Sequence, residues 1–144
     1  MRKEVSCGAV IFTQADGMRK YVIIESLEGS CGFPKGHMEG DETEVETALR
    51  EIREEVGLTV ELLPGFRAED SYPLPWKPHR IKRVIYFLAT YTGQPIRPQR
   101  RELRGAELLT FDEAMAKLRF DGVRRILREA DDYLRAHPPA EQKT

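Results

Sequence analysis

Long apolar runs, cysteine, tryptophan and an excess of charge of either sign are all scarce in this sequence. No stretch approaches the roughly 18 to 20 apolar residues of a membrane-spanning helix, and the first residues lack the apolar core of a signal peptide. The two cysteines, Cys7 and Cys31, match no metal-binding spacing, so we expect reduced thiols in a cytoplasmic protein. These absences argue against membrane proteins and disulfide-rich secreted proteins.

Acidic and basic side chains nearly cancel over the whole chain. Charged residues make up 33% of the sequence, yet the formal net charge is −1. We therefore expect no general attraction to nucleic acid or to a membrane surface. The 144 residues, 40% of them hydrophobic, suffice for one domain with its own core. We assign that domain to residues 1–137 and expect the polar segment 138–144 to be a disordered tail.

Negative charge is concentrated in residues 36–58. The segment holds eight acidic side chains and two basic ones, so it has a large negative net charge. The rest of the chain has a positive net charge that nearly cancels it. Such a concentration of like charge is unfavourable unless a positive group compensates it. The segment is therefore either a solvated acidic surface or a site for a cation.

The same segment predicts a helix from Thr43 to Val56, because it lacks Gly and Pro and is rich in helix-forming residues. Gly57 is expected to end it as a left-handed cap. Glu51, Glu54 and Glu55 share a face, where like charges repel and where a hard cation such as Mg²⁺ or Mn²⁺ would reverse the repulsion. The apolar stripe expected to face the core consists of Val45, Ala48, Leu49, Ile52 and Val56.

Nine positions of this segment resemble the signature of the Nudix hydrolases. That signature reads Gly, five residues, Glu, seven residues, Arg-Glu, an aliphatic, any residue, Glu-Glu, any residue, Gly and an aliphatic. The matching residues are Gly36, Glu42, Arg50, Glu51, Ile52, Glu54, Glu55, Gly57 and Leu58. The resemblance implies an α/β (α+β) fold, the Nudix α/β/α sandwich with a mixed sheet between helices.

The resemblance also implies a metal site. It assigns metal ligands to Glu51, Glu54 and Glu55, with the carbonyl of Gly36 as a further ligand. The implied cofactor is Mg²⁺ or Mn²⁺, in two or more ions. Glu54 and Glu55 are also candidates for the general base that accepts a proton from the attacking water.

Four residues beside these ligands have supporting roles in the prediction. In the family, Glu42 and Arg50 mainly orient the loop and the helix. Lys35 is either a surface charge or, as the Phe-Pro-Lys-Gly-His phrase implies in the family, a cation that neutralises a phosphate. His37 is either a phosphate or proton-transfer partner or a loop residue with a satisfied hydrogen bond.

Cations gather just before a predicted buried strand: Lys77, Arg80, Lys82 and Arg83. They form either a solvated strand end or a clamp for a polyphosphate, whose charge exceeds what two or three ions cancel. Lys82 followed by Tyr86-Phe-Leu resembles the bis(5′-nucleosyl)-tetraphosphatase branch of the Nudix hydrolases. There the matching lysine contacts phosphate and the tyrosine stacks on a nucleobase; packing in the core is the alternative for Tyr86.

Three residues elsewhere complete the predicted site. In the tetraphosphatase branch, a glutamate at the offset of Glu102 supplies a further metal ligand or the general base. A surface ion pair is the alternative for Glu102, and Glu107 is the alternative residue for that role. Phe120 is predicted either to sandwich a base together with Tyr86 or simply to pack. Trp76 is either a hydrophobic plug or a stacking platform.

Hydrophobic periodicity and turn residues predict the remaining elements. We expect strands at 4–13 and 20–27 joined by a turn, an extended segment over 59–71, a stiff loop over 72–79, strands at 80–89 and 106–110, a short helix from 111, and an amphipathic helix containing 123–134.

The implied activity is metal-dependent hydrolysis of a phosphoanhydride bond in a nucleoside polyphosphate, by attack of water on phosphorus. The preferred substrate prediction is diadenosine tetraphosphate, split into ATP and AMP. The alternatives are a nucleoside triphosphate, a sugar nucleotide, the 5′ triphosphate end of RNA, or a nucleotide sensor without catalysis. We expect a small-molecule nucleotide as the partner, no nucleic acid, no membrane, and a monomer or homodimer.

Overall fold

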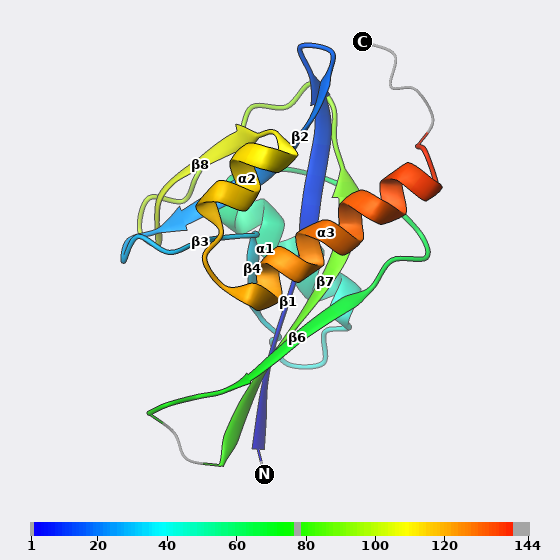
Figure 1. Ribbon diagram of the computed structural model, residues 1–144. Coiled ribbons are helices and arrows are strands. Elements are labelled where there is room, and N and C mark those ends of the chain that lie inside the picture. The colour runs from blue at the N-terminus through cyan, green and yellow to red at the C-terminus, as the bar shows by residue number, and fades with distance from the viewer. Residues whose placement is uncertain (1, 77–78, 140–144) are drawn as a thin grey trace.

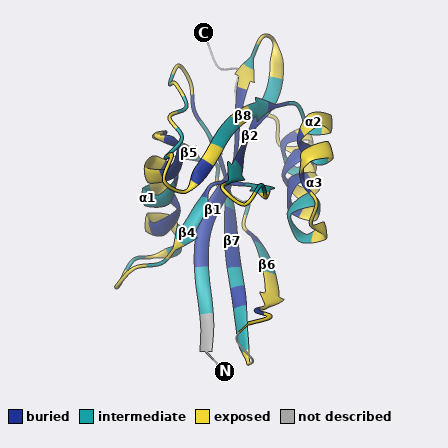
Figure 2. Ribbon diagram, turned by 90° about the vertical axis from the view of Figure 1, so that its left-hand side faces the viewer, coloured by how far each residue is buried: buried dark blue, intermediate teal, exposed yellow. Residues whose placement is uncertain are grey.

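The computed structural model describes residues 2–76 and 79–139, which form a mixed sheet flanked by helices (Figure 1). Figure 2 shows the layers: α1 covers one face of the sheet, and α2 and α3 cover the other. In chain order the elements are β1 (Arg2–Ala15), β2 (Met18–Ser26), β3 (Cys31–Gly32), β4 (Lys35–His37), α1 (Glu44–Val56), β5 (Glu61–Leu62), β6 (Ala68–Pro73), β7 (Arg80–Thr90), β8 (Leu103–Leu109), α2 (Phe111–Lys117) and α3 (Asp121–Ala136).

Strand β1 is the centre of the sheet. It forms a hairpin with β2, runs parallel to β7 along most of its length, and pairs near its start with the short strand β4. Strand β6 extends the sheet beyond β7, and β8 extends it beyond β2. The turn of the hairpin places Asp16 and Gly17 at positive φ, as tight hairpin turns require. The predicted mixed sheet between helices is confirmed.

Each face of the sheet has its own core. On one face, Ile52 and Val56 of α1 pack against Ala9 and Ile11 of β1. On the other face, the apolar side of α3 packs against β1, β2 and β7, because its residues at helical spacing turn toward the sheet. The α3 residues buried there are Ile126, Leu127, Ala130 and Leu134.

The predicted stripe of α1 is partly wrong. Ala48, Ile52 and Val56 are buried, but Val45 and Leu49 are 40% and 37% exposed. Instead, Thr47 and Glu55 lie on the buried side, where each finds a polar partner: the Thr47 hydroxyl donates to Glu42 and the Glu55 carboxylate accepts from the backbone of Lys35. Polar contacts to the preceding loop have therefore turned the helix away from the orientation that hydrophobicity alone predicts.

Most other elements lie where the sequence predicts them. The predicted 72–79 loop is shorter at its start, because β6 continues to Pro73, and β8 begins at Leu103. Cys7 and Cys31 are free thiols, as expected. Lys77 and residues 140–144 of the predicted tail lie outside the described residues. None of the described helices is long and apolar enough to cross a bilayer.

Candidate active site

The loop and helix of the acidic segment are fixed by caps at both ends of α1. Thr43 and Glu46 form a capping box, in which each side chain accepts a hydrogen bond from the other residue's backbone N–H. At the far end Gly57 has a φ of 72° and its N–H donates to the carbonyl of Arg53 at 3.0 Å. The helix therefore starts and stops as predicted, which sets the positions of the glutamates along it.

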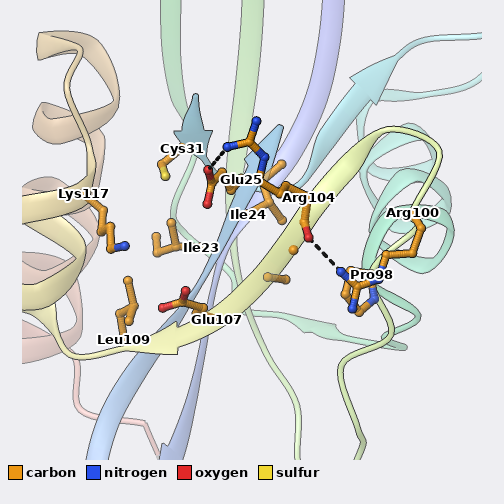
Figure 3. Close-up of a pocket in the computed structure, with 12 residues that line it drawn as sticks. Ile23, Ile24, Glu25, Cys31, Pro98, Arg100, Arg104, Glu107, Leu109 and Lys117 are labelled. Carbon is orange, nitrogen blue, oxygen red and sulfur yellow. Dashed lines mark hydrogen bonds and ion pairs between the residues drawn. The ribbon is translucent and has the colours of Figure 1, made fainter. Parts of the chain in front are cut away.

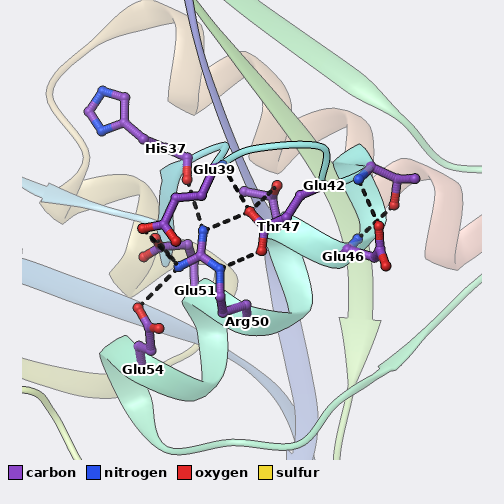
Figure 4. Close-up of polar contacts among 9 residues, drawn as sticks. His37, Glu39, Glu42, Glu46, Thr47, Arg50, Glu51 and Glu54 are labelled. Atoms are coloured by element: carbon purple, nitrogen blue, oxygen red, sulfur yellow. Dashed lines mark hydrogen bonds and ion pairs between the residues drawn. The ribbon is translucent and has the colours of Figure 1, made fainter.

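Arg50 joins the loop to the helix (Figure 4). Its Nε and Nη2 donate to the two carboxylate oxygens of Glu42 at 2.6 and 2.9 Å, and Nη2 also donates to the carbonyl of His37 at 2.9 Å. Its Nη1 donates to Glu51 at 2.8 Å and to Glu54 at 3.2 Å. These contacts connect the loop to the helix, and the orienting role of Glu42 and Arg50 stays a prediction.

Glu42 is the strongly neutralised carboxylate of the segment. Its hydrogen bonds from the Arg50 guanidinium lower its pKa to about 2, and bonds from the Glu39 backbone N–H and the Thr47 hydroxyl act in the same direction. Glu42 is thus a permanently charged partner of Arg50 at all ordinary pH values.

Glu51 and Glu55 are in the opposite situation. Burial, with a smaller contribution from the negative charges of Glu51 and Glu102, raises the pKa of Glu55 to about 7. Only the backbone N–H and the charge of Lys35 act against this shift. Burial also raises the pKa of Glu51, despite its bond to Arg50. These two carboxylates therefore have less positive charge around them than their ionised forms require.

Gly36 brings its backbone directly against Glu51. A Cβ atom at position 36 would lie 2.0 Å from the carboxyl carbon of Glu51, so any other residue would displace this side chain. Gly36 is held there by β4, which pairs with β1 at Cys7. If the Gly36 carbonyl and the Glu51 carboxylate are to bind the same cation, the backbone must come this close to the carboxylate.

The segment before β8 brings Glu102 to the same place. The backbone N–H groups of Arg97 and Gln99 donate to the carbonyls of Val56 and Glu55, both at 2.8 Å, which attaches this segment to the end of α1. The charge of Glu102 contributes to the raised pKa values of both Glu51 and Glu55. Glu107, the alternative, instead lies near Cys31 and contributes to the raised pKa of that thiol.

The chemistry of these donors fits a hard divalent cation. Buried carboxylates with raised pKa values, together with a backbone carbonyl, are the oxygen ligands that Mg²⁺ and Mn²⁺ prefer. In the described part of the chain, however, no three acidic, histidine or cysteine side chains already converge as a ligand set. Arg50 holds Glu51 and Glu54 instead, so cation binding requires these side chains to turn.

Lys82 and His37 meet on the face of the sheet opposite α1. The Nζ of Lys82 donates to the hydroxyl of Ser6 at 2.6 Å and lies 2.9 Å from the Nε2 of His37. Lys82 is only 7% exposed, and burial, followed by the charge of Lys35, lowers its pKa. The sequence singled out Lys82, His37 and Lys35 separately, and the structure places them close together.

Arg80 and Arg83 do not join this group. Arg83 follows Lys82 directly in β7, so its side chain leaves the opposite face of the sheet, where it donates to both oxygens of Glu69 at 3.0 and 2.6 Å. Arg80 donates to Glu4 at 3.3 Å. Contact of either arginine with phosphate stays a prediction.

The aromatic residues divide into buried and exposed ones. Tyr86 is 1% exposed and packs edge-on against Phe33, with ring centroids 5.3 Å apart. The burial of Tyr86 fits the alternative prediction that it packs in the core. Stacking of Tyr86 on a base stays a prediction. Phe120, the N-cap residue of α3, is 66% exposed, and Trp76 is 71% exposed, so neither is a core residue.

Sequence reasoning missed Tyr72. It is 42% exposed and pairs with Lys82 across β6 and β7, so both side chains leave the same face of the sheet. The start of α3 lies over this part of β6, because Asp70 reaches to within 2.4 Å of where a Cβ of Gly122 would be. The signal available in the sequence was the position of this tyrosine at the start of the proline-rich segment.

Comparison with known proteins agrees with the signature. The Nudix domain model matches residues 3–130. The chain belongs to the Nudix hydrolase family. It is 30% identical over 141 residues to the asymmetrical bis(5′-nucleosyl)-tetraphosphatase of Sus scrofa, covering 90% of this chain and 94% of that protein.

Two further comparisons concern the fold and the range of substrates. A Caenorhabditis elegans Ap4A hydrolase in a binary complex superimposes with a TM-score of 0.84 at 20% identity, covering 92% of this chain and 98% of that one. An 8-oxo-(d)GTP phosphatase of Mycolicibacterium smegmatis is 38% identical over 97 residues, which cover 67% of this chain but 28% of that protein. The protein is thus a Nudix pyrophosphohydrolase, in a family that depends generally on divalent metal ions.

Proposed function

We propose that this Nudix hydrolase splits diadenosine tetraphosphate asymmetrically into ATP and AMP, with Mg²⁺ or Mn²⁺ as its cofactor. The observation that carries the proposal is the similarity to the asymmetrical tetraphosphatase of Sus scrofa, which extends over nearly the full length of both chains. By contrast, the similarity to the 8-oxo-(d)GTP phosphatase covers a minor part of that larger protein. The arrangement of cations and aromatics around the signature also suits a long polyphosphate with a nucleobase.

Gly36, Glu51, Glu54 and Glu55 are the residues that would hold the cations. Bound divalent ions supply positive charge that activates a water molecule and offsets the charge developing on the phosphates. Arg50 fixes the starting orientation of Glu51 and Glu54. Burial keeps Glu55 in place beside the backbone of Lys35.

Glu102 is the group we assign as the proton acceptor. The oxygen of water attacks phosphorus, the phosphoanhydride P–O bond breaks, and the proton of the water passes to a carboxylate. Glu102 is exposed, and within the described residues its side chain has no ion-pair partner, whereas Glu54 is held by Arg50 and Glu55 is buried. An accessible, unpaired carboxylate close to the ligand set suits this step.

Lys35, Lys82 and His37 are assigned to the phosphate chain. Lys82 is a buried cation whose bonding partners, Ser6 and His37, bring it no negative charge. Burial lowers the pKa of Lys82, and the charge of Glu4, which is itself bonded to Arg80, offsets this only in part, so an anionic phosphate would stabilise the charged lysine. Phe120 and Tyr72 then flank the same face and provide exposed rings for one nucleobase, a role in which Tyr72 replaces Tyr86.

The test is product analysis by ion-exchange chromatography. The protein is incubated with Mg²⁺ and a panel of diadenosine tri-, tetra- and pentaphosphate, nucleoside triphosphates including 8-oxo-dGTP, a sugar nucleotide and triphosphorylated RNA. We expect equal amounts of ATP and AMP from the tetraphosphate, formed faster than any other product. Faster cleavage of another member would overturn the substrate proposal, and two molecules of ADP would overturn the asymmetric cleavage. Cytoplasmic location and a monomeric or homodimeric state stay predictions.

A further inference from the structure

A recess of about 210 Å³ lies beside the proposed active site, between the end of the sheet and α2 (Figure 3). Its lining comes from β2, β3, β8, α2 and the segment that carries Glu102. Ile23, Cys31 and Leu109 belong to the core cluster of the α2–α3 face, the cluster that also contains Tyr86. The recess therefore opens on the same side of the sheet as Lys82, at the opposite end.

The floor of the recess exists because position 105 is glycine. Gly105 of β8 and Cys31 of β3 lie in register on either side of Glu25 in β2, so the three residues form one row across the sheet. A Cβ at position 105 would meet no atom within 4 Å, and the backbone there is not in the left-handed region. A side chain at this position would fill the space that glycine leaves open.

The lining combines apolar and hydrogen-bonding groups. Ile23 and Leu109 supply apolar surface. Glu107 supplies a carboxylate that can accept a hydrogen bond from an amino group, while the Glu25 carboxylate already accepts one from Arg104 at 3.3 Å. The volume lies below the roughly 300 to 1,000 Å³ typical of sites that enclose drug-sized ligands. A planar base with an exocyclic amine, such as adenine, matches this size and chemistry better than a whole nucleotide.

The edge nearest the active site is basic. Arg100 and Arg104 line the recess, Arg100 donates to the carbonyl of Arg104 at 2.7 Å, and Arg104 donates to the carbonyl of Leu27 at 2.8 Å. The N–H of Leu27 in turn donates to the carbonyl of Glu102. Arg104 also donates to the carboxylate of Glu25 at 3.3 Å, so its guanidinium lies against the recess, in the segment that follows Glu102, where a phosphate chain could meet it.

We propose that the recess binds the second nucleobase of a dinucleoside polyphosphate, while Phe120 and Tyr72 hold the first. This inference rests on the proposed function and deepens it. The phosphates would run from Lys82 past β4, where Gly36 meets Glu51 of α1, to the segment that carries Glu102. The enzyme would then distinguish a dinucleotide from a mononucleotide with an equally long phosphate chain through the recess.

Cys31 allows the recess to be observed without turnover. It is half-buried in the lining, whereas Cys7 is fully buried, so a maleimide reagent modifies Cys31 selectively in the folded protein. The probe is a non-hydrolysable, methylene-bridged analogue of diadenosine tetraphosphate, with Mg²⁺ present. At ten times its Kd we expect it to slow modification of Cys31 about tenfold, as followed by intact-protein mass.

Two controls identify what protects the thiol. The Cys31→Ser variant establishes that Cys31 is the labelled site. Inorganic tripolyphosphate, which has phosphates but no base, should give no protection. Equal protection by tripolyphosphate would contradict a nucleobase site and indicate an anion site at the arginines. Unchanged labelling at saturating dinucleotide would also overturn the proposal.

Filling the recess provides the kinetic test. Gly105→Val should raise KM for diadenosine tetraphosphate about tenfold and leave KM for adenosine 5′-tetraphosphate unchanged, because the second substrate has only one base. Arg101→Ala is the matched control, since Arg101 lies in the same segment but does not line the recess. Equal KM changes for both substrates would contradict the proposal.

The outcomes separate this inference from the function on which it rests. A wild-type enzyme that does not split diadenosine tetraphosphate overturns the proposed function and this inference together. A wild-type enzyme that splits it, but shows no protection of Cys31 and no selective effect of Gly105→Val, overturns the second-base site alone.

Discussion

At the start of α1 the carboxylate of Glu42 accepts two hydrogen bonds from Arg50, and its pKa falls to about 2. At the end of the same helix Glu55 is buried against a single backbone N–H, and its pKa rises to about 7. Both are glutamates of one signature, yet the first has its counter-charge within the protein and the second lacks it. The start of the helix is thus neutralised within the protein, and its end is the part where we propose that a cation supplies the missing charge.

We expect the greatest loss of turnover from a substitution at the end of α1, where we propose that the cation binds. Glu54→Gln keeps the size of the side chain but removes a ligand charge, so we expect turnover to fall by at least about 100-fold. Melting temperature should change little, because Glu54 is exposed and, among the described residues, bonded only to Arg50. Initial rates with Mg²⁺ measure the effect. Glu129→Gln, an exposed glutamate of α3 paired with Arg125, is the control. Wild-type turnover in Glu54→Gln would refute its assignment as a ligand.

Glu55 predicts how the stability of the metal-free protein depends on pH. Its folded-state pKa of about 7 exceeds the ordinary 4.5, so folding binds a proton between these values and stability falls as pH rises through this range. The loss at pH 8 is about 3 kcal/mol relative to pH 4.5. Denaturant unfolding with a chelator present should show this decline.

Glu55→Gln should remove the decline, because glutamine has no charge to bury. Saturating Mg²⁺ should also reduce it in the wild type, since the cation compensates the ionised carboxylate. A decline of equal size in wild type and variant, both free of metal, would show that Glu55 is not its source.

The next largest effect on turnover is expected at the start of α1. Glu42→Gln leaves Arg50 with weaker bonds to the loop, so the guanidinium should bind Glu51 and Glu54 more closely and position them less well. We expect turnover to fall about tenfold to 100-fold, as for residues that orient metal ligands, together with a lower melting temperature. Circular dichroism melts and initial rates measure both. A loss of turnover exceeding that of Glu54→Gln would reverse the division between the two ends.

The smallest of these effects concerns the cations outside the signature. Lys82→Ala should raise KM for diadenosine tetraphosphate about tenfold while kcat changes less, because the lysine binds phosphate away from the reacting atom. A sugar nucleotide with two phosphates provides the comparison, and its KM should change less. Equal changes for both substrates would argue against a clamp for long phosphate chains. Arg101→Ala, which removes an exposed cation outside the predicted clamp, is the matched control.

The sequence predicted the signature segment better than it predicted the face that we propose binds the substrate. Glycines, glutamates and Arg50 of the signature lie within one loop and one helix, so their spacing alone fixes their mutual positions. Even there the apolar stripe was misplaced at Val45 and Leu49, because polar contacts of Thr47 and Glu55 set the rotation of the helix. Local spacing was enough to place these residues on one loop and one helix, and not enough to predict the packing around them.

The substrate-binding face depends on contacts between distant segments. Lys82 meets His37 only because β7 and β4 both pair with β1. The burial of Tyr86, the exposure of Tyr72 and the recess at Gly105 follow from strand register and from where α2 and α3 lie. One sequence contains no direct signal for the burial of Tyr86 or for the recess, and for Tyr72 it offers only the position next to the proline-rich loop.

We propose that the end of α1, and not its start, binds the cation. Mn²⁺ binding, counted by electron paramagnetic resonance in the wild type, Glu55→Gln and Glu42→Gln, tests it most directly. We predict that the wild type binds Mn²⁺, that Glu55→Gln weakens binding at least about tenfold, and that Glu42→Gln weakens it less. Unchanged Mn²⁺ affinity in Glu55→Gln, or a greater loss in Glu42→Gln, would contradict the claim.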